Sequence, residues 1–202
     1  MNKLRLLGIF DTKLNHITLC YASLVLWAYP DTPDYFEQIH AATVGDKNYF
    51  PNVSNLVNNA QRLKIATDEL YSSAHRSAIK DLFPLLKKYC HDTGQMELLK
   101  DQAWFDFWWV LRNCWSHDMT FNFNPAEKKR LPIRWLDVSV TEEMNGRPLT
   151  HGQCSYEHLR LLVETARSVR TELWPNRSLK YVPALMGLHR TRLSALLSSN
   201  VI

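Results

Sequence analysis

Residues 103–118 read AWFDFWWVLRNCWSHD, and this stretch decides which fold the chain can adopt. At about 100° per residue, its large apolar side chains gather on one arc of a helix. That arc holds Trp104, Phe107, Trp108, Leu111, Cys114 and Trp115. The other arc holds Asp106, Trp109, Arg112, Asn113, Ser116 and His117. Because the apolar arc must be buried against other elements, the stretch is predicted to be an inner helix of a helical bundle.

Hydrophobic spacing and helix-end signals predict further helices on both sides of this stretch. Before it, helices are expected at 13–29, 34–42, 55–73 and 74–90, with a loop at 45–54. The stretch itself is expected to lie in a helix at 97–117, followed later by a helix at 155–173, which Ser155 can cap, and a helix at 184–197. Gly94 is placed to end one helix in the left-handed conformation, and Pro84 predicts a kink or a new turn.

A change of period at 133–140, IRWLDVSV, indicates strands rather than helix. Asn145-Gly146 is a strong turn signal, and Pro148 confines the second strand to a sheet edge. We therefore expect a small β-hairpin at about 132–150, inserted between helices. The predicted fold class is mainly α, a helical bundle with this hairpin, in a single domain over residues 1–202 with a C-terminal helical extension at about 176–202.

The composition of the chain indicates which partners and which cellular compartment suit the protein. The net charge of +4 and a pI of about 8.9 are compatible with a polyanionic partner. The four cysteines form no CxxC pair and no disulfide-scaffold spacing, which favours reduced thiols and a cytoplasmic protein. The longest apolar run, residues 17–29, is shorter than the roughly 20 residues that span a bilayer, so no membrane partner is expected.

The polar arc of the central helix carries groups suited to phosphodiester chemistry. Arg112 offers a planar fork that can grip a phosphate through two hydrogen bonds. The imidazole of His117 can give or take a proton near neutral pH, and Asn113 can orient either neighbour. Such a set could promote attack of an RNA 2′-hydroxyl on its own phosphodiester with no metal and no cofactor. Taken singly, Arg112 is more typical of an ion pair and His117 of a helix C-cap.

This reaction needs a base at the 2′-oxygen and an acid at the leaving 5′-oxygen, whereas one motif supplies one histidine. A two-fold homodimer that pairs the polar face with itself would supply two of each residue. Trp109 and Ser116 lie on that face. We therefore expect a symmetric dimer with the site at its interface and with Trp109 and Ser116 in the contact.

The string Arg112-Asn113-Cys114-Trp115-Ser116-His117 resembles the R-x(4–6)-H motif of the HEPN superfamily, in its variant with four intervening residues. The motif lies late in a helical bundle, as it does in that family. The resemblance implies an all-α core, dimerisation through the motif helices and metal-independent endoribonuclease activity, with Arg112 and His117 catalytic and Asn113 supporting. It also implies a role as a toxin or an antiviral, anti-phage defence effector, with an antitoxin or a defence-system protein as a further partner.

Other surfaces could contact RNA. The basic stretch KKRLPIR follows the motif and offers Lys128, Lys129, Arg130 and Arg134 for the phosphate backbone, although such stretches are most often solvated loops. The aromatic run at 104–109 could stack a base, but it more often forms core.

Two alternatives stay open from the sequence. Cys114-x2-His117 and His151-x2-Cys154 together have the ligand types of a tetrahedral zinc site. Against that site, Cys114 falls on the buried arc of the helix. The second alternative is a catalytically inactive HEPN-like module that binds nucleic acid or a protein partner and uses the same face to dimerise.

Overall fold

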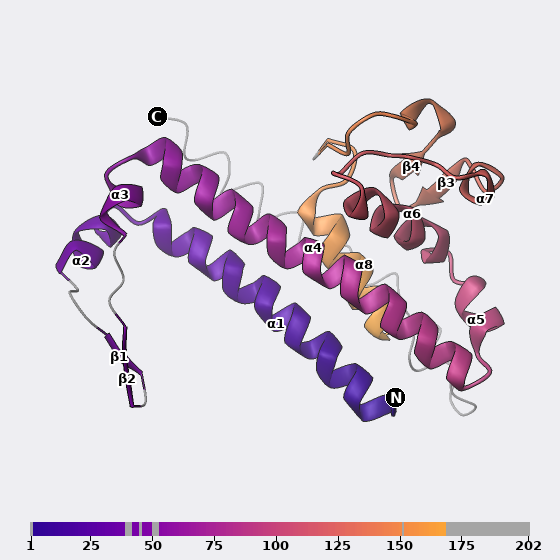
Figure 1. The fold of residues 1–202 in the computed structure, drawn as a ribbon, viewed down its shortest axis with the longest axis horizontal. Coiled ribbons are helices and arrows are strands. Elements are labelled where there is room, and N and C mark those ends of the chain that lie inside the picture. The colour runs from indigo at the N-terminus through magenta and orange to yellow at the C-terminus, as the bar shows by residue number, and fades with distance from the viewer. Residues whose placement is uncertain (1, 39–41, 45, 50–52, 151, 169–202) are drawn as a thin grey trace. The chain divides into compact units, whose positions relative to one another are not determined.

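Eight α-helices and two small β-hairpins make up the part of the chain that the structure describes (Figure 1). This computed structural model describes residues 2–38, 42–44, 46–49, 53–150 and 152–168. The helices are α1 Lys3–Trp27, α2 Thr32–Gln38, α3 Ser54–Val57, α4 Ala60–Asp92, α5 Met96–Lys100, α6 Phe105–Ser116, α7 Pro125–Lys128 and α8 Tyr156–Ser168. The strands are β1 Ala42–Val44, β2 Lys47–Tyr49, β3 Ile133–Trp135 and β4 Val138–Val140, and a 3-10 turn covers Glu142–Met144.

The architecture confirms the predicted fold class, a mainly helical bundle with a β-hairpin. The chain divides into two compact units, residues 1–168 and 169–202. The second unit lies outside the described residues, and so do the predicted helix at 184–197 and the C-terminal extension. The β1–β2 hairpin was not predicted, because β2 falls inside the stretch at 45–54 that was expected to be a loop.

Helix α4 is the element on which the bundle is built, since α1, α3, α5, α6 and α8 all contact it. It is one continuous helix of 33 residues, where the sequence predicted two. The expected break after Ser73 is absent, and the Ser73 hydroxyl donates back to the Leu70 carbonyl at 2.9 Å within the continuous helix. Pro84 lies within it. The helix closes before Gly94, whose φ of +69° confirms the left-handed conformation expected there.

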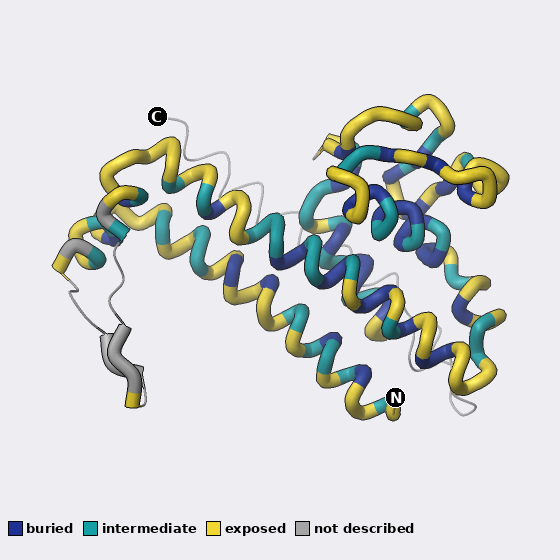
Figure 2. The backbone as a smooth tube through the Cα atoms, in the orientation of Figure 1, coloured by how far each residue is buried: buried dark blue, intermediate teal, exposed yellow. Residues whose placement is uncertain are grey.

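Helix α1 runs alongside α4 in the opposite direction (Figure 1). It begins ten residues before the predicted start at residue 13, because Asn2 caps it by accepting a hydrogen bond from the Arg5 N–H at 2.9 Å. Its buried side chains are Leu6, Phe10, Ile17 and Cys20. Figure 2 shows that much of the remaining surface of α1 is exposed, in contrast to α6.

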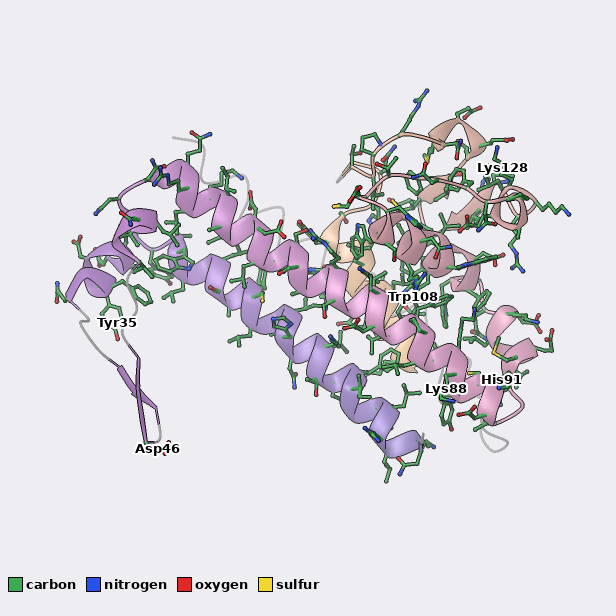
Figure 3. The ribbon with its side chains drawn as sticks, viewed as in Figure 1. Tyr35, Asp46, Lys88, His91, Trp108 and Lys128 are labelled. Atoms are coloured by element: carbon green, nitrogen blue, oxygen red, sulfur yellow. The ribbon has the colours of Figure 1, made fainter. Side chains whose placement is uncertain are left out.

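The predicted apolar arc of α6 is buried along its whole length (Figure 2). At its centre, Trp108 is fully buried, and its indole N–H donates to the Ile79 carbonyl of α4 at 3.0 Å (Figure 3). Its ring also contacts Phe10 of α1, Phe83 of α4 and Trp104, with centroids 5.5 to 6.5 Å apart. One side chain thus joins three helices.

The predicted single helix at 97–117 is wrong, because the chain breaks between α5 and α6. In one straight helix, Leu99 and Trp108 would point in opposite directions, since nine residues at about 100° each add half a turn to two full ones. Both side chains are fully buried. The break allows both of them to enter the core.

The β3–β4 hairpin forms within the predicted range but with a different turn. Its strands pair Ile133 with Val140 and Trp135 with Val138, and the chain turns at Leu136, which has a φ of 53°. Trp135 stacks on Phe107 of α6 with centroids 5.2 Å apart, which attaches the hairpin to the bundle.

The predicted hairpin turn at Asn145-Gly146 is wrong. Gly146 does adopt a positive φ of 76°, but the segment after it pairs with the segment after α6. The Gly146 N–H donates to the Phe121 carbonyl at 2.6 Å, and the Leu149 N–H donates to the Met119 carbonyl at 2.7 Å. Pro148 forms an isolated bridge with Thr120. Asn145 has a φ of −58°, so only Gly146 takes the positive φ typical of an Asn-Gly hairpin turn, and tertiary packing decides the partner of the segment.

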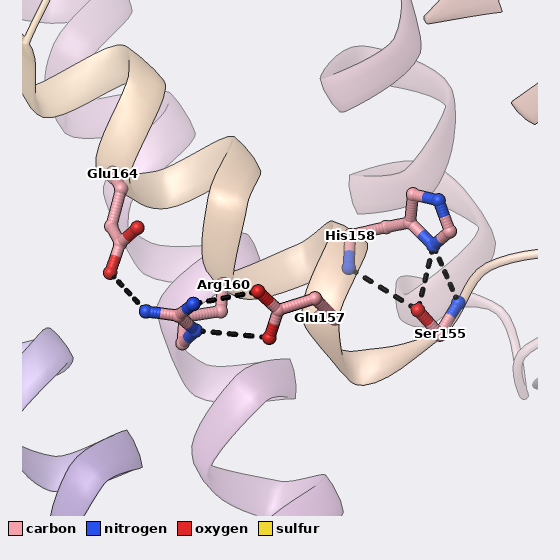
Figure 4. A network of polar contacts seen from close by, with 5 residues as sticks. All are labelled: Ser155, Glu157, His158, Arg160 and Glu164. Carbon is pink, nitrogen blue, oxygen red and sulfur yellow. Dashed lines mark hydrogen bonds and ion pairs between the residues drawn. The ribbon is translucent and has the colours of Figure 1, made fainter. Parts of the chain in front are cut away.

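Helix α8 begins at the predicted cap, Ser155 (Figure 4). The Ser155 backbone N–H donates to His158 Nδ1 at 3.2 Å, and His158 Nε2 donates to Asp137 at 2.8 Å, which ties α8 to the β3–β4 turn. Arg160 pairs with Glu157 and Glu164, each at 2.6 Å, on the surface of α8. The predicted extension of this helix to residue 173 lies beyond the described residues.

Substitution of Trp108 tests this account of the core. Trp108→Phe removes the indole N–H that binds Ile79 and leaves unfilled volume between three helices. We expect the free energy of unfolding to fall by about 1–3 kcal/mol, measured by urea denaturation. The matched control is Leu98→Ala on the exposed face of α5, which should cost less than about 1 kcal/mol. Equal losses in the two variants would contradict a central role for Trp108.

Candidate functional site

The candidate residues lie at the last turns of α6 and directly after it. Arg112 and Asn113 are half-buried, whereas Ser116 and His117 are exposed. The Ser116 hydroxyl donates to the Arg112 carbonyl at 2.9 Å. His117 is the C-cap, with φ −128° and ψ 64°, so it lies outside the helix in which it was predicted. Asp118 and Met119 then take positive φ values of 53° and 56°, and the chain turns away from the helix axis.

A chain of hydrogen bonds runs from Arg112 into the protein. Arg112 Nη1 donates to Asn113 Oδ1 at 2.9 Å, and Asn113 Nδ2 donates to Glu127 Oε1 at 2.5 Å. Asn113 was expected to orient either neighbour, and the structure shows it in contact with Arg112. Glu127 was not among the candidate residues.

Glu127 is held by its own helix. Its exposed fraction is 1%, and its second carboxylate oxygen accepts from the Asn124 backbone N–H at 2.8 Å. Asn124 in turn caps α7 by accepting from the N–H groups of Ala126 and Glu127. The two residues thus form a capping box. A buried carboxylate needs hydrogen-bond partners for its oxygens. The Asn113 amide and the Asn124 N–H supply one partner to each oxygen and so hold the carboxylate in position.

Arg112 makes no ion pair with any residue that the structure describes. One of its five N–H donors is used by Asn113. The remaining fork of a half-buried guanidinium is suited to an oxyanion such as a phosphate. His117 follows four residues after Asn113 and is exposed. Its imidazole can give or take a proton near neutral pH, as a reaction at a bound phosphate requires.

Trp109 lies on the polar side of α6, half-buried, as the sequence predicted. The guanidinium of Arg130 covers it, 4.9 Å from its ring centre, and also pairs with Asp106 of α6. This cation–π contact and ion pair attach the end of α7 to α6. Arg130 is therefore already engaged within the chain, and Trp109 offers only its uncovered part to a partner.

The other basic candidates differ in how they are held. Lys128 on α7, labelled in Figure 3, pairs with Glu142 at 3.5 Å. Lys129 and Arg134 are exposed, and neither makes an ion pair within the described part of the chain. Arg134 lies on β3 opposite Ser139, on the face of the hairpin away from buried Ile133 and Trp135. Lys129 and Arg134 are thus the two cations of this group most open to a phosphate.

Of the four ligands predicted for a zinc site, the structure shows the two cysteines near each other. Cys114 and Cys154 are buried, and they are close enough for the charge of one to raise the pKa of the other. Burial raises the pKa of both thiols to about 12. His117 is exposed, and His151 lies outside the described residues. Over the residues described, no group of three or more metal-ligating side chains is placed to hold an ion.

Comparison of the chain with protein-family models, with curated proteins and with solved structures gave no match. No helix among the described residues is both long and apolar enough to cross a membrane.

One signal in the sequence could have identified Glu127. Asn124-Pro125-Ala126-Glu127 has the spacing of a capping box, with proline in the first turn, and predicts a short helix with Glu127 turned back toward its start. The contact from Glu127 to Asn113 joins residues 14 positions apart on different helices. No local pattern reports a contact of that kind.

The state of the buried thiols gives a pH prediction. In the unfolded chain a cysteine ionises near its ordinary pKa of 9.0, whereas Cys154 stays protonated in the fold up to about pH 12. The unfolded chain therefore binds fewer protons above pH 9, and the stability of the fold decreases as pH rises. From pH 8 to pH 10 each such thiol should cost about 1.4 kcal/mol. Cys154→Ala should lose correspondingly less than the wild type in urea denaturation, and equal losses would count against the raised pKa.

Proposed function

We propose that the protein is a metal-independent endoribonuclease of the HEPN type, with Arg112, Asn113 and His117 in its active site. The observation that carries the proposal is a half-buried arginine, oriented by Asn113 and without a carboxylate partner in the described chain, followed closely by an exposed histidine. In this position the histidine can exchange protons with solvent and substrate, and the arginine can bind a phosphate.

The reaction begins with proton transfer from the RNA 2′-hydroxyl to one imidazole. The 2′-oxygen forms a bond to phosphorus, and negative charge develops on the non-bridging oxygens, where the Arg112 guanidinium would stabilise it. The bond to the 5′-oxygen then breaks, and a second imidazole donates a proton to that oxygen. The products are a 2′,3′-cyclic phosphate and a free 5′-hydroxyl. No metal or cofactor takes part in this sequence of steps.

The second imidazole is His117 of another copy in a symmetric homodimer. The exposed end of α6, at Ser116 and His117, supports this arrangement, since a two-fold axis there brings two motifs together. Trp109 lies further along the same polar side. Lys128, Lys129, Arg130 and Arg134 form the basic region after the motif, and within the described residues Lys129 and Arg134 are the two without an ion pair.

The HEPN resemblance also suggests a cellular role for the protein. It suggests a cytoplasmic toxin or antiviral defence effector, kept in check by an antitoxin or another protein of a defence system. A metal-independent ribonuclease needs such restraint, because RNA is always present in the cytoplasm.

A second candidate function is an inactive HEPN-like module that binds a protein partner or nucleic acid. Exposed apolar side chains in the C-terminal half of α1 favour it: Leu19 is 70% exposed, Val25 45% and Leu26 47%. Between His16 and Asp31 the chain carries no charged residue. Apolar surfaces of this kind are typical of interaction sites.

Cleavage of RNA in excess EDTA tests the ribonuclease proposal. We expect the wild type to cleave with EDTA present, and Arg112→Ala and His117→Ala each to reduce kcat by at least about 100-fold, because each removes a group that acts in the transition state. Matched controls are Arg62→Ala and His91→Ala, exposed residues of the same types on α4. Binding of RNA without cleavage by the wild type would favour the second candidate function.

The dimer is tested at Ser116. Ser116→Arg puts a bulky charge on the exposed end of α6, so we expect it to convert a dimer into a monomer in analytical ultracentrifugation and to reduce cleavage in parallel. Thr12→Arg on α1 is the matched control, because Thr12 is also exposed and also donates its hydroxyl to a carbonyl four residues earlier. A monomeric wild type that cleaves RNA, or an unaffected Ser116→Arg dimer, would rule out this interface.

A further inference from the structure

The structure points to Glu127 as a positioning residue of the candidate site, which acts on Arg112 through Asn113. The observation is the hydrogen-bonded chain from the Glu127 carboxylate, through the Asn113 amide, to the Arg112 guanidinium. This inference rests on the proposed function, since it assigns Glu127 a part in the same reaction. Glu127 touches neither RNA nor the reacting atoms in this account.

The donor and acceptor properties of the three groups fix the orientation of the Asn113 amide between Glu127 and Arg112. A carboxylate only accepts hydrogen bonds, and a guanidinium only donates them. Asn113 must therefore turn its NH2 group toward Glu127, which leaves its oxygen facing Arg112. If the amide turned over, it would place NH2 against the guanidinium and oxygen against the carboxylate, and both hydrogen bonds would be lost.

Glu127 is able to impose this orientation because burial and a second hydrogen bond hold its carboxylate in place. It is buried, and its other oxygen is bound to the Asn124 backbone within the α7 capping box. A side chain fixed in this way has a single position in which its first oxygen meets Asn113. The carboxylate also polarises the amide, which makes Asn113 Oδ1 a stronger acceptor for Arg112.

The consequence is an arginine oriented before RNA arrives. Arginine has many rotamers, and an unrestrained guanidinium would have to be ordered during binding. The hydrogen bonds that start at Glu127 hold one edge of the Arg112 guanidinium and leave its other N–H groups free to bind the phosphate. Loss of the anchor should therefore lower kcat more than it weakens RNA binding, because misplacing a group that acts in the transition state mainly affects the chemical step.

Glu127→Gln tests the assignment with little change of shape. A glutamine has one acceptor oxygen where the site requires two, so either the Asn124 N–H or the Asn113 amide loses its partner. We expect kcat to fall by about 10- to 100-fold, with KM changed less than about 3-fold and the pH profile of kcat unshifted, since His117 is not altered. Asn113→Ala should give a similar loss, and the double variant should be no worse than either single one.

The control separates positioning from helix capping. Asn124→Ala removes the side chain that caps α7 but leaves the Asn124 N–H and the Glu127–Asn113 bond in place. It should lower the Tm yet keep kcat within about 3-fold of the wild type, at a temperature where every variant is folded. A loss of kcat in Asn124→Ala equal to that in Glu127→Gln would mean that Glu127 serves only the stability of α7.

A spectroscopic measurement keeps this inference separate from the proposed activity. The side-chain NH2 signals of Asn113, assigned by their loss in Asn113→Ala, should shift in Glu127→Gln and exchange faster with water. Failure of the wild type to cleave any RNA would overturn the proposed function and, with it, the part given to Glu127. Unmoved Asn113 signals, unchanged kcat in Glu127→Gln, or additive losses in the double variant would overturn the inference about Glu127 while leaving the ribonuclease proposal standing.

Discussion

Burial of the apolar arc of α6 is the constraint on which the rest of the structure depends. Its central side chain, Trp108, contacts α1 and α4 and donates a hydrogen bond to α4, so α6 cannot rotate about its axis without losing all of these contacts. Once this arc is fixed, the opposite side of the helix must face outward. The polar residues at the end of α6 are therefore displayed by the packing of the apolar ones.

The elements that follow α6 are held by the same helix. Phe107 stacks on Trp135 of the β3–β4 hairpin, and Asp106 pairs with Arg130 after α7. The segment after His117 pairs with residues 146–149, which returns the chain to the end of α6. α7 is thereby placed so that Glu127 reaches Asn113. A short insertion that looks peripheral in the sequence thus supplies the support behind the candidate site.

This support gives the site two contrasting parts. Arg112 is tied through Asn113 to a buried carboxylate, whereas His117 lies outside the helix and is exposed. For the proposed phosphodiester cleavage, a held arginine would stabilise charge and an exposed histidine would exchange protons.

The sequence by itself determined the helical class, the buried arc of α6, the left-handed turn at Gly94 and the cap at Ser155. These features depend on periodicity and on residues a few positions apart, which a linear pattern records. Only the tertiary structure decided the break before α6, the partner of residues 146–149 and the link between Glu127 and Asn113. The break follows from the need to bury both Leu99 and Trp108, and the other two join residues far apart in the chain. Such contacts depend on which surfaces meet after folding, and the energy of packing many side chains together selects among pairings that local propensity leaves equal.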